Sequence, residues 1–162
     1  MASRKKDSEI NLVKLGQSLG ITFLAAFIGS YFTTPAIEGW YSDLAKPLLN
    51  PPNWVFAPVW TILYILMGLS FYLIWNSNNK KKATAAKVFF IQLVLNSLWS
   101  IVFFGLENPP LAFLVIIALW LAIAWTIVKF NEISRKASYY LIPYLLWVSF
   151  AAYLNIAIWI LN

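Results

Sequence analysis

The chain has 162 residues, of which 61% are hydrophobic and only 11% are charged, and its formal net charge is +6. A soluble domain carries about a quarter charged residues, so this composition predicts an integral membrane protein. The sequence contains no Cys and no His, which excludes disulfides, zinc sites, thiol nucleophiles, His general bases and the usual haem axial ligand.

Five uncharged segments are long enough to cross a bilayer, which takes about 20 apolar residues in a helix. They span residues 15–34, 54–75, 88–106, 110–128 and 138–161. None alternates like a strand, and helices satisfy their own backbone in lipid, so we predict an all-α bundle of five transmembrane helices forming one domain over residues 1–162. The first segment is longer than the apolar part of a signal peptide and lacks a cleavage-like site, so we interpret it as a span.

The basic residues divide unevenly between the two ends of such a bundle. Of the 12 Lys and Arg residues, all but Lys46 fall on one side: Arg4, Lys5, Lys6, Lys14, Lys80, Lys81, Lys82, Lys87, Lys129, Arg135 and Lys136. The positive-inside rule therefore predicts a cytoplasmic N-terminus and a C-terminus outside. We expect these charges to contact lipid headgroups and not nucleic acid.

The polar side chains within the spans are few. No Asp, Glu, Lys, Arg or His occurs in them, which argues against a pump, a proton-coupled carrier or a selective ion channel. Gln92, Asn96 and Ser100 are spaced i, i+4, i+8, so they share one stripe that should face the bundle interior. Such amides either join helices to one another or, at Asn96 or Gln92, contact a ligand.

Two other spans carry patterned faces. The first has a face of small residues, which either packs closely within the protomer or across a dimer, or lines a pocket: Ser18, Thr22, Ala25, Ala26, Gly29 and Ser30. The fifth places Trp147, Ala151 and Asn155 on one stripe, a pattern that suits the wall of an apolar cleft. Trp60, Trp99 and Trp147 lie a turn or two inside their spans, and indoles that converge on a cavity would suit a large planar apolar ligand.

The segment over residues 35–53 joins the first two spans and is rich in both Pro and aromatic residues. Pro47, Pro51 and Pro52 stiffen it. Because its Trp and Leu side chains need burial, we expect it to fold down as an outward-facing lid over the mouth of the bundle.

Three blocks then carry a family resemblance. "WYSDLAKP" with "NPPNWVFAPVWTILY", "QLVLNSLWSIVFFG" and "PYLLWVSFAAYLN" resemble the signature of the TspO/MBR family, and the likeness covers nearly the whole chain from Gly16. The resemblance implies a five-helix bundle, often a homodimer, whose pocket beneath the first loop binds protoporphyrin IX and other tetrapyrroles, isoquinoline- and benzodiazepine-type drugs and, in eukaryotic members, cholesterol. The ligand-binding residues implied by motif position are Ser30, Phe56, Ala57, Trp60, Tyr64, Asn96, Trp99, Trp147, Ala151 and Leu154.

This sequence departs from the family pattern in places. Many relatives begin the fourth span with Trp-Ala-x-x-Asp, and this chain has Leu-Ala-Phe-Leu-Val at 111–115. Tyr153 is not followed by Lys or Arg, so the cholesterol pattern of eukaryotic members is absent.

The sequence thus favours a multi-pass membrane receptor for porphyrin-like ligands, with no obligatory cofactor and no metal site, in a bacterial cell membrane. Alternatives remain open. One is light-dependent porphyrin degradation, attributed to some bacterial members with two Trp implicated, whose counterparts here are Trp60 and Trp147. Others are a transporter of lipophilic metabolites, disfavoured as an alternating-access carrier because no inverted repeat is evident, and a helical scaffold with Trp anchors.

Overall fold

The fold is described by a computed structural model over residues 10–162. Within that range it is helical, and five helices are long and apolar enough to cross a membrane, which confirms the predicted number of spans. They are α1 (Leu12–Glu38), α3 (Phe56–Trp75), α4 (Lys82–Ser100), α5 (Pro109–Asn131) and a fifth span made of α6 (Arg135–Tyr140) and α7 (Ile142–Leu161).

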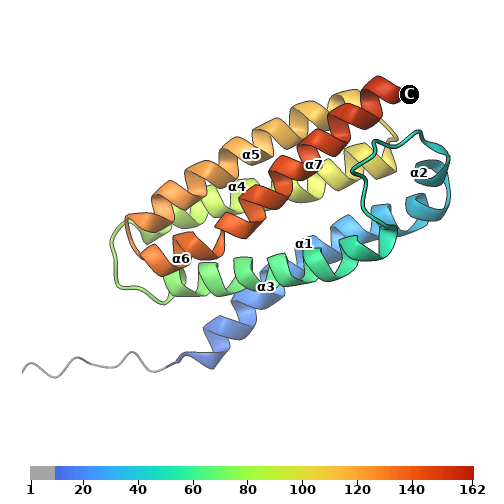
Figure 1. The fold of residues 1–162 in the computed structure, drawn as a ribbon. Coiled ribbons are helices and arrows are strands. Elements are labelled where there is room, and N and C mark those ends of the chain that lie inside the picture. Colours follow the sequence, from blue (N-terminus) through green and yellow to red (C-terminus); the bar gives the residue numbers. More distant parts are fainter. Residues whose placement is uncertain (1–9) are drawn as a thin grey trace, which may run out of the picture.

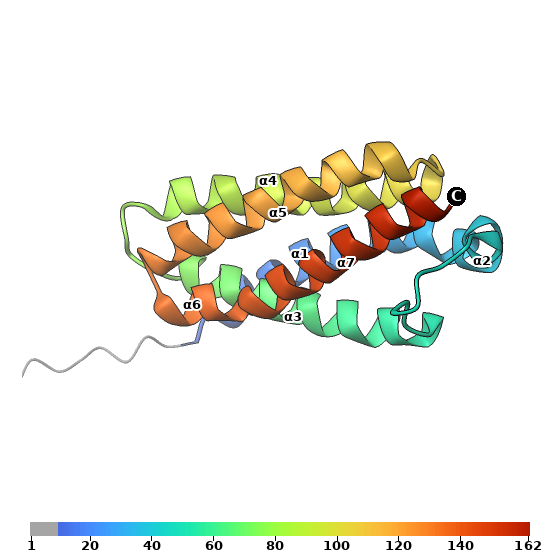
Figure 2. The same ribbon diagram turned by 45° about the horizontal axis from the view of Figure 1, so that its top comes forward.

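The helices form an elongated bundle (Figure 1). The short helices α2 (Trp40–Asp43) and α6 mark its opposite ends, and the C-terminus lies near the α2 end. Figure 2 shows α7 running between α5 and α3, with α1 behind. In this view α7 thus lies beside both α3 and α5.

Helix ends differ from the predicted spans by several residues. The helix α1 continues to Glu38 although Pro35 lies within it, because a proline in the last turn removes only one hydrogen bond. The helix α4 begins at Lys82, six residues before the predicted start at 88, because helical hydrogen bonds can continue past the point where charges begin. These charged turns extend the helices beyond the apolar stretch.

Two prolines and a π-helical turn shape the remaining ends. The last span is divided at Leu141, and Pro143 lies in the first turn of α7, where its missing N–H removes no helical bond. Asn108 caps α5 by accepting the Leu111 N–H, just before Pro109. At the α2 end, α4 passes into a π-helical turn, η2 (Ile101–Gly105), which directs Phe103 and Phe104 toward α2.

The linker is only partly the loop predicted for residues 35–53. Its first residues are helical, in α1 and α2, and Tyr41 is buried against Phe103 and Phe104. Of the Leu side chains that were expected to be buried, Leu44 is partly buried beside Tyr41 and Phe103. The expectation was wrong for Leu48 and Leu49, which are 99% and 63% exposed. Both lie in a tight turn, closed by the Asn50 N–H donating to the Pro47 carbonyl, that holds them away from the bundle.

The core is filled with aromatic rings at the α6 end. Phe71 stacks on Phe89 with ring centroids 4.7 Å apart, and Phe89 stacks on Phe130 at 5.7 Å. All three side chains are buried. The bundle is therefore well packed at this end, and the space available for a ligand lies toward α2.

The small-residue face of α1 packs within the protomer. Thr22 donates its hydroxyl to the Tyr64 carbonyl at 3.0 Å, and a Cβ built on Gly29 would lie 3.2 Å from the Ser100 hydroxyl oxygen. Ser18, Thr22, Ala25 and Gly29 are all buried. The structure shows both packing and pocket lining for this face: α1 packs against α3 and α4, and Ala26, Gly29 and Ser30 also line the cavity described below.

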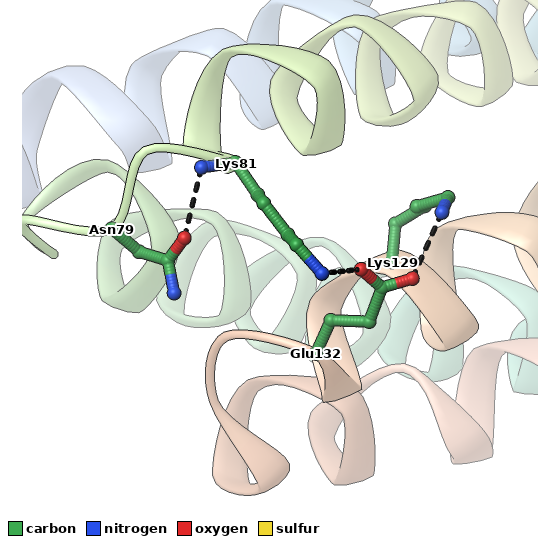
Figure 3. Close-up of polar contacts among 4 residues, drawn as sticks. All are labelled: Asn79, Lys81, Lys129 and Glu132. Atoms are coloured by element: carbon green, nitrogen blue, oxygen red, sulfur yellow. Dashed lines mark hydrogen bonds and ion pairs between the residues drawn. The ribbon is translucent and has the colours of Figure 1, made fainter.

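Among the described residues, the basic side chains other than Lys46 lie toward the α6 end, as their distribution in the sequence predicts. Glu132 accepts hydrogen bonds from Lys129 and Lys81, each at 2.8 Å, and so joins the α5–α6 and α3–α4 turns (Figure 3). The same figure shows the Lys81 N–H donating to the Asn79 side chain. The Lys129 and Lys81 ammonium groups lower the pKa of Glu132 to about 2. The basic residues predicted at Arg4, Lys5 and Lys6 lie outside the described residues.

Candidate functional site

The site begins where α1 and α3 cross. A Cβ built on Gly68 would lie 2.7 Å from the Leu19 Cδ2 atom and 3.1 Å from the Leu19 Cα atom, so this glycine lets the two backbones touch. From this crossing toward α2, side chains of both helices line a single cavity, which α4, η2 and α7 close on the other sides.

The cavity has a volume of about 560 Å³, within the range of about 300–1,000 Å³ that holds drug-sized ligands. The described residues that line it carry no charge. Its aromatic wall consists of Phe23, Phe27, Tyr41, Phe56, Trp60, Tyr64, Trp99, Phe103, Phe104 and Trp147. Such a wall favours a flat, largely apolar ligand, because rings bind through stacking and dispersion.

Two Trp side chains from different helices form part of this wall. Trp60 on α3 stacks on Tyr64 with ring centroids 5.6 Å apart. Trp147 on α7 contacts the Phe56 ring edge to face at 6.0 Å, and its indole N–H is buried with no hydrogen-bond partner in the part of the chain that the structure describes. The contact between Phe56 and Trp147 joins α3 to α7 next to the cavity.

A third indole is fixed by hydrogen bonds. The Trp99 N–H donates to the Asn155 side-chain oxygen at 3.0 Å, and the Asn155 amide donates to the Pro109 carbonyl at 2.8 Å. Trp99 also stacks on Phe103 at 5.3 Å. Asn155 therefore joins α4, α5 and α7, and the stripe Trp147, Ala151 and Asn155 lines the cavity as the sequence predicts.

The linker closes the α2 end of the cavity through Tyr41 and is tied to the end of α7. The Ala45 N–H donates to the Asn162 side-chain oxygen at 2.9 Å, and the Asn162 amide returns a bond to the Ala45 carbonyl at 3.0 Å. The Tyr41 hydroxyl donates to Asn50 at 2.9 Å. Burial raises the pKa of the Tyr41 hydroxyl above its ordinary value.

Comparison with known proteins agrees with this arrangement. The sequence profile of the TspO/MBR family matches residues 18–160. The chain is 44% identical to "Tryptophan-rich protein TspO" of Archaeoglobus fulgidus over 94% of its length and 99% of that protein. It is 38% identical to "Tryptophan-rich sensory protein" of Cereibacter sphaeroides (85% of this chain, 87% of that protein) and 35% identical to human "Translocator protein" (84% and 82%).

The chain belongs to the TspO/MBR family. It is an integral, multi-pass membrane protein with five spans. The family assignment made from the three sequence blocks is therefore confirmed.

The residues named from the TspO/MBR resemblance lie almost entirely around one cavity. Ser30, Phe56, Ala57, Trp60, Tyr64, Trp99, Trp147, Ala151 and Leu154 line it. Asn96 does not: it is 2% exposed and lies behind the wall. Gln92, from the same stripe, is 1% exposed, and both polar atoms of its amide lack a hydrogen-bond partner among residues 10–162.

Sequence reasoning missed part of the wall of this TspO/MBR cavity. Phe23 and Phe27 on α1, Thr61 on α3 and Phe104 on η2 line it without having been singled out. A Phe in an apolar span carries no signal of its own, because most Phe residues there face lipid or core. The contact between Asn162 and Ala45, far apart in the sequence, had no local pattern either.

Proposed function

We propose that this protein is a membrane receptor that binds porphyrins and similar planar, largely apolar ligands in the aromatic cavity. The observation that carries the proposal is an uncharged hollow with indoles from three helices in its wall: Trp60, Trp99 and Trp147. The cavity lies within the spanning helices, where a ligand that partitions into the bilayer is already concentrated.

The site chemistry favours a metal-free tetrapyrrole over one that needs an axial ligand. The sequence has no His and no Cys, which are common donors to haem iron. Met67 is fully buried and does not line the cavity, and the Tyr64 hydroxyl is engaged in a hydrogen bond. We therefore propose that free-base protoporphyrin binds at least as well as haem.

The test is a titration of protoporphyrin IX, in the dark, with the protein in lipid nanodiscs, following the Soret band of the pigment. Trp60→Ala and Trp147→Ala each remove one stacking wall, and we expect each to weaken binding about tenfold, which corresponds to about 1.4 kcal/mol. Trp125→Ala is the matched control, because Trp125 is 51% exposed and lies away from the cavity.

Binding that stays unchanged in both cavity variants, or that falls equally in the Trp125 control, would contradict the proposal. The first result would place the pigment elsewhere. The second would mean that the loss reflects general damage to the bundle.

A further inference from the structure

Asn96 lies between two tyrosines that both contact Trp60, and this arrangement gives it a role other than ligand contact. We infer that Asn96 is a positioning residue: it fixes the rings of Tyr64 and Tyr144, and these two rings hold the Trp60 indole at the cavity wall. The expected effect of Asn96 on ligand affinity rests on the proposed function. The expected effect of Asn96 on the position of Trp60 does not, because it applies to the protein without ligand.

The hydrogen bonds run across three helices. The Tyr64 hydroxyl of α3 donates to the Asn96 side-chain oxygen of α4 at 2.6 Å. The Asn96 amide nitrogen donates to the Tyr144 hydroxyl of α7 at 3.0 Å. All three side chains are buried, with Tyr144 fully so. One amide therefore sets the position of two phenol rings.

Both rings contact the same indole from different directions. Tyr64 stacks on Trp60 with an interplanar angle of 30°, and Tyr144 meets Trp60 at 6.2 Å with an angle of 67°. Tyr64 is itself held at its backbone, because its carbonyl accepts a hydrogen bond from Thr22. The Trp60 indole thus packs face to face against the Tyr64 ring and edge to face against the Tyr144 ring, and hydrogen bonds to Asn96 hold both rings in place.

The amide is poorly placed to serve a ligand directly. Asn96 is absent from the cavity wall, and both its oxygen and its nitrogen already bond to tyrosines. Breaking these bonds to reach a ligand would leave a buried phenol unpaired, at a cost of about 1–3 kcal/mol in a site that excludes water. The family motif implied that Asn96 contacts the ligand. We infer instead that Asn96 acts on the ligand indirectly, through the two tyrosines.

A mutant cycle separates the indirect role from direct contact. Asn96→Leu, which keeps a similar volume, should weaken protoporphyrin binding about tenfold in the wild-type background, or about 1.4 kcal/mol. In a Tyr64→Phe/Tyr144→Phe background, where no hydroxyl is left to orient, Asn96→Leu should change the affinity by less than about twofold. The change to Leu also leaves no buried polar group without a partner in that background.

A direct contact between Asn96 and the ligand would give the opposite result. Asn96→Leu would then weaken binding by the same factor in both backgrounds, and that outcome overturns the inference. Ser70→Ala is the control, because Ser70 is buried, donates to the Ala137 carbonyl and does not line the cavity. It should leave the affinity unchanged.

A second measurement needs no ligand. With 5-fluorotryptophan incorporated, the ¹⁹F resonance of Trp60 can be assigned by its loss in Trp60→Phe. We expect Asn96→Leu and Tyr64→Phe to shift or broaden this resonance and to leave that of Trp125 unchanged. An unaffected Trp60 resonance would overturn the inference, whereas a wild-type protein that binds no protoporphyrin would overturn only the proposed function.

Discussion

Gly68 is the residue on which the shape of the site depends most directly. It lies where α1 and α3 cross, and the Leu19 Cα atom and the Thr22 hydroxyl oxygen would both be 3.1 Å from an added Cβ. The Leu19 Cα atom belongs to the backbone, so a change of rotamer cannot move it out of contact. The tight crossing places Phe23 and Trp60 on the walls of one cavity.

Gly68→Ala should therefore destabilise the protein by about 1–3 kcal/mol, because overpacking forces the two backbones apart. Unfolding in mixed detergent micelles measures this free energy. Gly20→Ala is the matched control on α1, since a Cβ there would meet nothing within 4 Å. Equal stability of the two variants would mean that the crossing is not close-packed.

Single residues also show where sequence reasoning reached its limit. Trp60, Trp99 and Trp147 could be assigned to a cavity because indoles one or two turns inside a span stand out from interface anchors. Asn96 could be placed in the interior from its stripe, but its two tyrosine partners lie 32 and 48 residues away and no periodicity reveals them. Leu48 and Leu49 were expected to be buried from hydrophobicity alone, and a local turn exposes them.

At the scale of elements, the spans were predictable because uncharged runs of about 20 residues have few alternatives in a chain this apolar. The exact ends of the helices were not predictable, because a helix can extend past the apolar stretch, as α4 does by beginning at Lys82. The linker was predictable as stiff from its prolines. The attachment of the linker to Asn162 joins residues far apart in the sequence, so no local sequence pattern predicts it.

The linker attachment can be tested through hydrogen exchange. Asn162→Ala removes both bonds to Ala45, so the Ala45 amide should lose protection and exchange at least about tenfold faster, since each hydrogen bond contributes about 1 kcal/mol. The measurement is peptide-level exchange by mass spectrometry. Amides in the middle of α5 are the internal control and should not change. Unchanged exchange at Ala45 would mean that the linker is held by other contacts.

The ion pairs that join the α3–α4 and α5–α6 turns predict a pH effect. Hydrogen bonds from Lys129 and Lys81 lower the pKa of Glu132 from 4.5 to about 2. A lowered folded-state pKa adds stability that is present above about pH 4.5 and is lost as the pH falls toward 2. The unfolding temperature of Glu132→Gln should thus lie below that of the parent at neutral pH and converge with it in acid. A constant difference across this pH range would contradict the assignment.

At the scale of the whole molecule, the basic residues at the α6 end predict which way the protein lies in the membrane. The sequence has no Cys, so single cysteines can report orientation. Leu48→Cys, at the 99% exposed linker turn, should react with a membrane-impermeant maleimide in intact cells. Lys80→Cys, at the α3–α4 turn, should react only after lysis. The reverse pattern would overturn the predicted topology.

We expect a planar ligand to lie among indoles of separate helices, in the uncharged cavity between the crossing of α1 and α3 and the α2 end. The most direct measurement is a structure of the protoporphyrin complex in lipid. We predict the tetrapyrrole between Trp60 and Trp147, with Asn96 still bonded to its two tyrosines. A pigment on the lipid-facing surface, or one held through its carboxylates by the lysines at the α6 end, would contradict the account.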